Sequence, residues 1–178
     1  TFTGKDLSSN ATGSIDPNIG LSYHIGGVAH VQIGNSFAIR PAVYFKQSTT
    51  IGFYDNLNFT DIEIPIDILF SKRTSKNHKI YFGAGPNIVY SIGGNVNDGF
   101  SVGRDLNFGT STLDDFKPMG IGANVKVGMQ FAFGFGWSVY SNPGLGNRSV
   151  TPDVSRWRNA DLFGLNLSFT FGGGGKGS

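Results

Sequence analysis

Histidine is the residue type in this chain best suited to bind a metal ion or to act as a general base. The sequence has three, His24, His30 and His78. His24 and His30 fall on one face of a predicted strand, but six positions separate them and no further ligand follows at zinc-site spacing. Cysteine is absent from the sequence, and the one Gly-x-Ser-x-Gly run, at 99–103, falls in a polar stretch with no helix after it, unlike the strand-to-helix turn that this motif requires. We therefore expect no catalytic residue, no metal site and no cofactor; the alternative is a membrane enzyme whose serine, histidine and acid meet only in three dimensions.

Two short runs have a superficial likeness to ligand-binding motifs. Asn95, Asn97 and Asp98 precede a glycine, but the later glutamate of a helical calcium loop is missing, which favours a polar turn. In the Gly-rich segment 172–178, Lys176 is followed by glycine rather than serine or threonine, which excludes a phosphate loop. We expect one domain over residues 1–171 and a disordered tail over residues 172–178.

The elements that must position any site are predicted to be strands. Apolar residues recur at every second position at 61–71, 119–131 and 163–171, and a period of two indicates a strand. Less regular alternation runs through 19–33, 36–47, 79–92 and 133–141, which makes seven readable strands. The chain is also rich in Gly and Phe, with 27 and 16 respectively, as an all-β fold would allow.

Short and long connections alternate along the chain. Short links are expected at 35–36, 72–78 and 134–136, and longer polar loops at 48–58, 94–116 and 142–160. This alternation is typical of an antiparallel up-and-down barrel in the outer membrane, with short turns on the periplasmic rim. The fold class expected is therefore all-β, a transmembrane barrel of eight strands of which seven are readable here.

The apolar faces carry more side chains than the interior of an eight-stranded barrel can hold, so they are expected to face lipid. The predicted lipid-facing residues are Ile64, Ile66, Val125, Val127, Leu165 and Leu167. The polar faces then line the lumen, where charges are costly unless paired. We expect a luminal charge network of Arg40, Lys46, Asp61, Glu63, Asp67 and Lys126, with Glu63 paired to Arg40 or Lys126. A proton or ion path through these groups is the alternative.

Composition limits the partners. The net charge is +2 and only 15% of residues are charged, which excludes a basic surface for nucleic acid. No stretch approaches the roughly 20 apolar residues of a membrane helix, but a membrane strand needs only about 9 to 11. The expected partners are outer-membrane lipid and other envelope proteins. A soluble ligand-binding barrel of the lipocalin type, or a narrow channel or conduit for small or hydrophobic ligands, are the alternatives.

Three segments resemble successive strands of the PorT-like outer-membrane β-barrel family of Bacteroidetes. They are Arg40–Gln47, Asp61–Ile66 and Phe82–Pro86, and the Ile-Glu-Ile-Pro and Gly-Ala-Gly-Pro runs are the most specific. Ala42 departs from the family, which often carries Glu there. The resemblance implies an eight-stranded barrel in the outer membrane, with roles that are often undefined in the family and that in some members are tied to protein secretion or to larger envelope assemblies. It implies no catalytic residues.

The readable strands leave the barrel one strand short. Counted back from Phe171 on the short-turn rim, they place Ile19 on the long-loop rim, so residues 1–18 are predicted to be a long outer loop. Single-chain barrels of bacteria have an even strand number. We therefore expect the eighth strand to come from outside these residues, from a segment before Thr1 or from a partner chain, and to separate the strands at 19–33 and 161–171.

Overall fold

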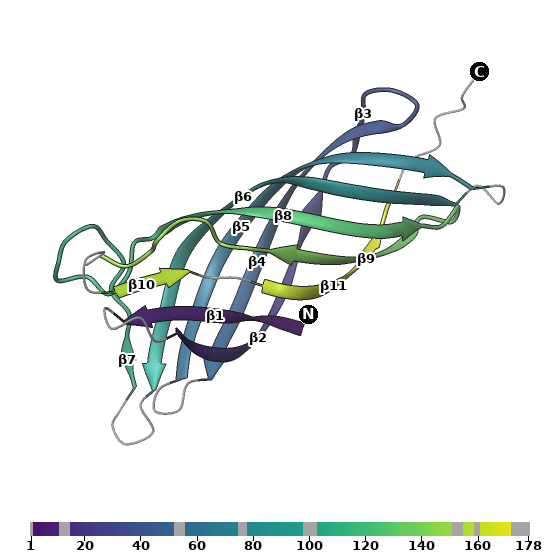
Figure 1. The fold of residues 1–178 in the computed structure, drawn as a ribbon. Coiled ribbons are helices and arrows are strands. Elements are labelled where there is room, and N and C mark those ends of the chain that lie inside the picture. The colour runs from purple at the N-terminus through teal and green to yellow at the C-terminus, as the bar shows by residue number, and fades with distance from the viewer. Residues whose placement is uncertain are drawn as a thin grey trace.

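The computed structural model describes residues 2–10, 15–51, 56–74, 78–97, 103–150, 155–158 and 161–171. In these residues the regular structure is entirely β-strand, and every strand pairing is antiparallel. The sheet is strongly curled (Figure 1), which confirms the expected fold class. The strands are β1 (Phe2–Asn10), β2 (Ile15–Val28), β3 (Val31–Gln32), β4 (Phe37–Ile51), β5 (Asn56–Arg73), β6 (Lys79–Asn97), β7 (Arg104–Asp105), β8 (Met119–Gln130), β9 (Phe135–Asn142), β10 (Ser155–Arg158) and β11 (Asp161–Phe169).

The seven predicted strands correspond to β2, β4, β5, β6, β8, β9 and β11, and each main strand pairs with the next along the chain. The long loop predicted at 48–58 is wrong, because β4 continues to Ile51 and β5 begins at Asn56. Polar residues pair across these strand ends, where the Thr49 hydroxyl donates to Asn58 Oδ1 at 2.7 Å. The strands are stabilised at these ends by polar pairs across the ladder, so the sequence there lacks the apolar alternation that would predict a strand.

The expectations for the N-terminal region are corrected by β1. Residues 2–10 are a strand rather than part of an outer loop, and they occupy the position of the eighth strand that was expected from elsewhere. β1 pairs with β2 between Phe2↔Leu21 and Ser9↔Ile15, and with β10 between Leu7↔Arg158 and Asn10↔Ser155. Figure 1 shows β1 beside β10. As expected, no ladder joins β2 directly to β11 in the described residues.

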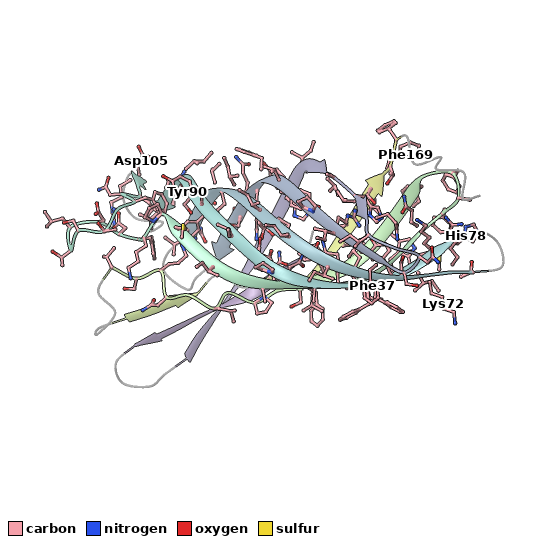
Figure 2. All side chains as sticks on the ribbon, turned by 90° about the horizontal axis from the view of Figure 1, so that it is seen from above. Phe37, Lys72, His78, Tyr90, Asp105 and Phe169 are labelled. Carbon is pink, nitrogen blue, oxygen red and sulfur yellow. The ribbon has the colours of Figure 1, made fainter. Side chains whose placement is uncertain are left out.

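The two faces of the sheet have opposite chemistry. In β5 the odd-numbered residues from Phe59 to Ser71 are buried, whereas Ile66, Ile68 and Phe70 on the other face are exposed. The outer aromatic residues Phe37 and Phe169 project away from the wall (Figure 2). Because successive strand residues point to opposite faces, one alternating pattern produces both a polar interior and an apolar exterior.

Two small apolar clusters lie at opposite ends of the interior. Ala38, Leu69 and Tyr81 pack together near the short turns. Phe59 and Leu106 pack near the long loops, together with Leu57, Val96, Phe108 and Phe116. The interior between these clusters is polar, and it contains the candidate site.

Candidate functional site

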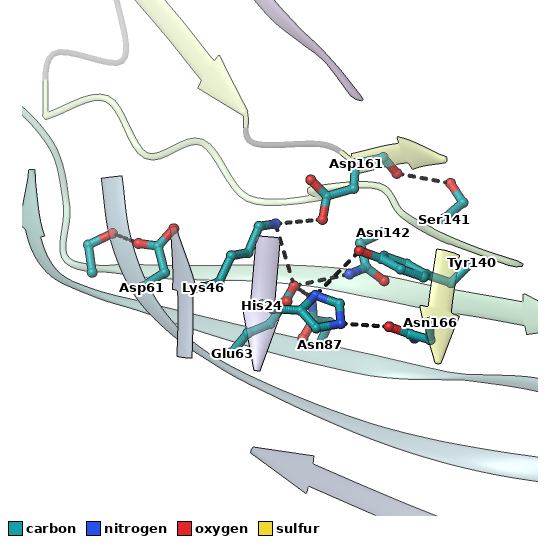
Figure 3. Close-up of polar contacts among 11 residues, drawn as sticks. His24, Lys46, Asp61, Glu63, Asn87, Tyr140, Ser141, Asn142, Asp161 and Asn166 are labelled. Atoms are coloured by element: carbon teal, nitrogen blue, oxygen red, sulfur yellow. Dashed lines mark hydrogen bonds and ion pairs between the residues drawn. The ribbon is translucent and has the colours of Figure 1, made fainter. Parts of the chain in front are cut away.

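Lys46 is the centre of the first group of buried charges (Figure 3). Its ammonium lies 2.5 Å from Asp161 Oδ2 and 3.9 Å from Glu63 Oε1, and all three side chains are buried. Glu63 Oε1 also accepts hydrogen bonds from the side-chain amides of Asn87 at 2.7 Å and Asn142 at 3.0 Å. The carboxylate is therefore compensated by one cation and two amides, as a buried charge requires.

The expected partner of Glu63 was wrong. Glu63 pairs with Lys46 rather than with Arg40 or Lys126. The registers explain this, since Tyr44 lies opposite Glu63 and Lys46 lies opposite Asp61, so Lys46 is the diagonal cation on the neighbouring strand. A diagonal neighbour is within reach of a long side chain.

Lys126 and Asp67 form a second group nearer the short turns. The Lys126 ammonium lies 2.6 Å from Asp67 Oδ2, and the Asn124 amide donates to Asp67 Oδ1 at 2.7 Å. Arg40 lies opposite Asp67 in the ladder, but its guanidinium donates to the Tyr81 hydroxyl at 3.3 Å and lies 5.6 Å from the centre of that ring. The six predicted luminal residues therefore all face the interior, in successive layers.

Asp61 belongs to a third group on the side of the long loops. It accepts a hydrogen bond from the Ser91 hydroxyl, and that hydroxyl in turn accepts one from Arg148 Nη2 at 2.5 Å. Arg148 also donates to the carbonyl of Lys117 at 3.1 Å and lies over the Phe59 ring. One arginine thus ties the 143–150 loop to the barrel interior and to the segment before β8.

Sequence reasoning did not identify Asp161 and Arg148. Asp161 has the parity of the exposed residues Phe163 and Leu165, but a bulge between Asp161 and Gly164 adds one residue to β11 and turns Asp161 inward. Arg148 is part of a Gly-rich loop with no periodicity. No sequence signal marked either residue.

His24 makes contacts of a structural kind. Its Nε2 lies 2.6 Å from Asn166 Oδ1, its ring stacks on Tyr44, and its Nδ1 lies 3.4 Å from the Tyr140 hydroxyl. Within the described residues, no group of three or more His, Asp or Glu side chains is arranged to hold a metal ion.

The predicted lipid-facing residues lie on the outer face. Five of them are 40% to 67% exposed and Ile64 is partly buried. The five are Ile66, Val125, Val127, Leu165 and Leu167.

A small recess remains beside the first and third charge groups. It encloses ≈ 420 Å³ free of atoms, part of it open to solvent, and its lining includes Lys46, Asp61, Glu63 and Arg148. Glycines lie close to the large interior side chains, and a Cβ added at Gly120 would come within 3.0 Å of Arg148. The interior is therefore filled mainly by side chains.

An antiparallel barrel wall with charged residues inside and Ile, Val, Leu and Phe outside defines the class of outer-membrane β-barrels. A family model described as outer membrane protein beta-barrel domain matches residues 1–149. The chain belongs to this family, and its location is the outer membrane. A search of curated proteins and a search of solved structures each found no match to this chain. Among the described residues, there is no helix long and apolar enough to cross a membrane.

Proposed function

We propose that this chain is a closed, non-catalytic barrel that acts as a structural or protein-interaction component of the outer membrane. The observation that carries the proposal is the filled interior. Lys46, Glu63 and Asp161 in one layer, and Lys126 and Asp67 in the next, are buried and bound to one another. A barrel of eight strands has room for side chains but not for a continuous water column.

The outer wall supports a direct contact with lipid. Val127 and Leu167, on β8 and β11, are 51% and 67% exposed, and each is flanked along its strand by other exposed apolar residues. Exposure of this many apolar side chains to water would be abnormal for a soluble monomer. We infer that this face contacts the acyl chains, including the partly buried Ile64.

The finer family assignment supports a role in a larger assembly. The three segments that resemble PorT-like barrels of Bacteroidetes lie on β4, β5 and β6, which are neighbours in the sheet. Some members of that family take part in protein secretion or in larger envelope assemblies, and we propose a role of that kind for this chain. The exposed apolar tip of the outer loop, where Leu113 is 89% exposed, is a suitable contact for such a protein.

The decisive experiment measures ion conductance of the purified protein in a planar lipid bilayer. We expect a silent bilayer, with a porin inserted under the same conditions as the positive control. Steady conductance of the wild-type chain would contradict the proposal and favour a narrow channel. A photo-crosslinker in place of Leu113 should give a discrete protein adduct in intact outer membranes, whereas the same group in place of Val127 should label lipid.

A further inference from the structure

The mouth of the barrel at the short turns is strongly cationic. The described segments that reach this rim are 29–40, 68–74, 78–84, 126–138 and 164–171, and their sequences contain no Asp or Glu. Their cations include Arg40, Lys72, Arg73 and Lys79, and two histidines that count as neutral at pH 7, His30 and His78, lie beside them. Figure 2 shows Lys72 and His78 at one end of the molecule and Asp105 at the other. The positive charge is therefore concentrated on the rim that faces the periplasm.

Two of these cations are held directly opposite one another. Arg73 at the end of β5 pairs in register with Lys79 at the start of β6, and both have the parity of the interior residues Ser71 and Tyr81. The backbone N–H of Thr74 donates to the carbonyl of His78 at 2.8 Å, which closes the turn between them. Like charges directly opposite across a ladder destabilise it, so this pair gains from a bound anion.

A second pair of basic residues lies on the neighbouring part of the mouth. His30 falls between the matched pairs Val28↔Ala42 and Val31↔Ile39, which places it opposite Arg40. Lys79 and Arg40 both lie close enough to His30 to act on it electrostatically. We call Arg40, Arg73 and Lys79, beside which His30 lies, the cationic mouth.

Among the described residues, no carboxylate forms an ion pair with Arg40, Arg73 or Lys79. Asp67 lies nearest along the wall, but it is fully buried and already bound to Lys126 and Asn124. Leu69 and Tyr81 pack across the interior at this level. An anion that compensates the mouth must therefore approach from the periplasm.

We propose that the cationic mouth binds a carboxylate-rich segment of a periplasmic protein. A protein segment suits it better than lipid, because Arg73 and Lys79 have the parity of the interior residues of β5 and β6, whereas lipid headgroups surround the outside of the wall. Lys72 lies two positions after the exposed Phe70 on β5, so its side chain is on the outer face of the strand, toward the membrane. Clusters of Arg and Lys recognise acidic motifs through charge-assisted hydrogen bonds. This inference names a partner for the proposed interaction role and rests on it.

The test uses the whole protein in nanodiscs of phosphatidylcholine and a fluorescent hexaglutamate peptide, with binding followed by anisotropy. We expect salt-sensitive binding that weakens by about tenfold in the double variant Arg73→Gln and Lys79→Gln. The matched controls Lys72→Gln and Arg104→Gln should bind as wild type, and Arg73→Lys with Lys79→Arg should retain binding. Each single Gln variant should give part of the loss, which keeps the test valid if the double variant folds poorly.

The proposal is overturned if hexaglutamate does not bind, or if the double Gln variant binds it as well as wild type. It is also overturned if Lys72→Gln weakens binding equally, or if nanodiscs with phosphatidylglycerol abolish binding, because lipid headgroups would then be the occupant. A conducting bilayer would contradict the proposed function without affecting this titration, so the two failures are distinguishable.

Discussion

Removal of the Lys126 ammonium should leave a carboxylate uncompensated in the middle of the barrel. Asp67 is 0% exposed and Lys126 is 3% exposed, so water cannot replace the lost cation without opening the wall. In the variant Lys126→Met, Asp67 would retain the amide of Asn124 as its hydrogen-bond donor. Arg40 is the nearest cation in the ladder, but it already donates to Tyr81.

The expected cost follows from this geometry. Breaking a buried ion pair by removing one partner costs about 3–5 kcal/mol, because the remaining charge stays desolvated. Methionine retains most of the lysine stem, so the contribution from lost packing should stay below about 1.5 kcal/mol. Adding Asp67→Asn removes the stranded charge and keeps an acceptor for Asn124. The double variant should therefore recover most of the loss.

The assay is equilibrium unfolding by urea in lipid vesicles, followed by tryptophan fluorescence and by heat-modifiable mobility on gels. Lys72→Met, the same substitution at an exposed lysine, is the matched control and should change the free energy of unfolding by less than about 0.5 kcal/mol. A loss below about 1 kcal/mol for Lys126→Met would refute the reasoning. So would a double variant that is no more stable than the single one.

Two further predictions concern the outer loop and the interior glycines. The Arg104 guanidinium donates to both oxygens of Asp115 at 2.7 and 2.8 Å and lowers the pKa of that carboxyl. Because its pKa is lowered, the ionised carboxyl stabilises the loop at neutral pH, and this stabilisation is lost as the pH falls below about 4. Protease cleavage of the 104–116 loop should therefore increase below that pH. The variant Asp115→Asn should abolish this pH dependence. Gly164→Ala places a Cβ against the Tyr140 ring and should lower the free energy of unfolding by about 1–3 kcal/mol in the urea assay. Gly27→Ala is the control, because no heavy atom lies within 4 Å of the added Cβ, and it should cost far less. Equal losses in the two variants would contradict a crowded interior.

The face of each strand could be predicted from the sequence because the side-chain period of a strand is two. Residues such as Asp67 and Val127 were assigned to opposite faces on that basis, and the structure places them so. Partner identity could not be predicted, because it depends on register. Whether Glu63 meets Lys46 or Lys126 is decided by the pairing of Tyr44 with Glu63, which depends on how the neighbouring strands are aligned along their whole length.

Local sequence was also insufficient where the backbone departs from regular geometry or lacks an apolar pattern. A bulge in β11 turns Asp161 to the opposite face of the sheet, and no residue type in this strand predicts the bulge. The segment 2–10 contains Gly, Asp, Ser and Asn, which favour turns, yet it is a strand because β2 and β10 provide partners on both sides. Strand propensity depends strongly on such tertiary context.

The lengths of the strands connect the fold to the proposed interaction role. β5 and β6 have 18 and 19 residues, whereas crossing the bilayer takes about 9 to 11. The wall therefore continues beyond the membrane on the long-loop side. Phe59, Leu106 and Phe116 pack at that end, and Arg148 binds the carbonyl of Lys117 there. The segments 103–118 and 143–150 are thus held to the wall, and a partner that binds them loses less conformational entropy than one that must order free loops.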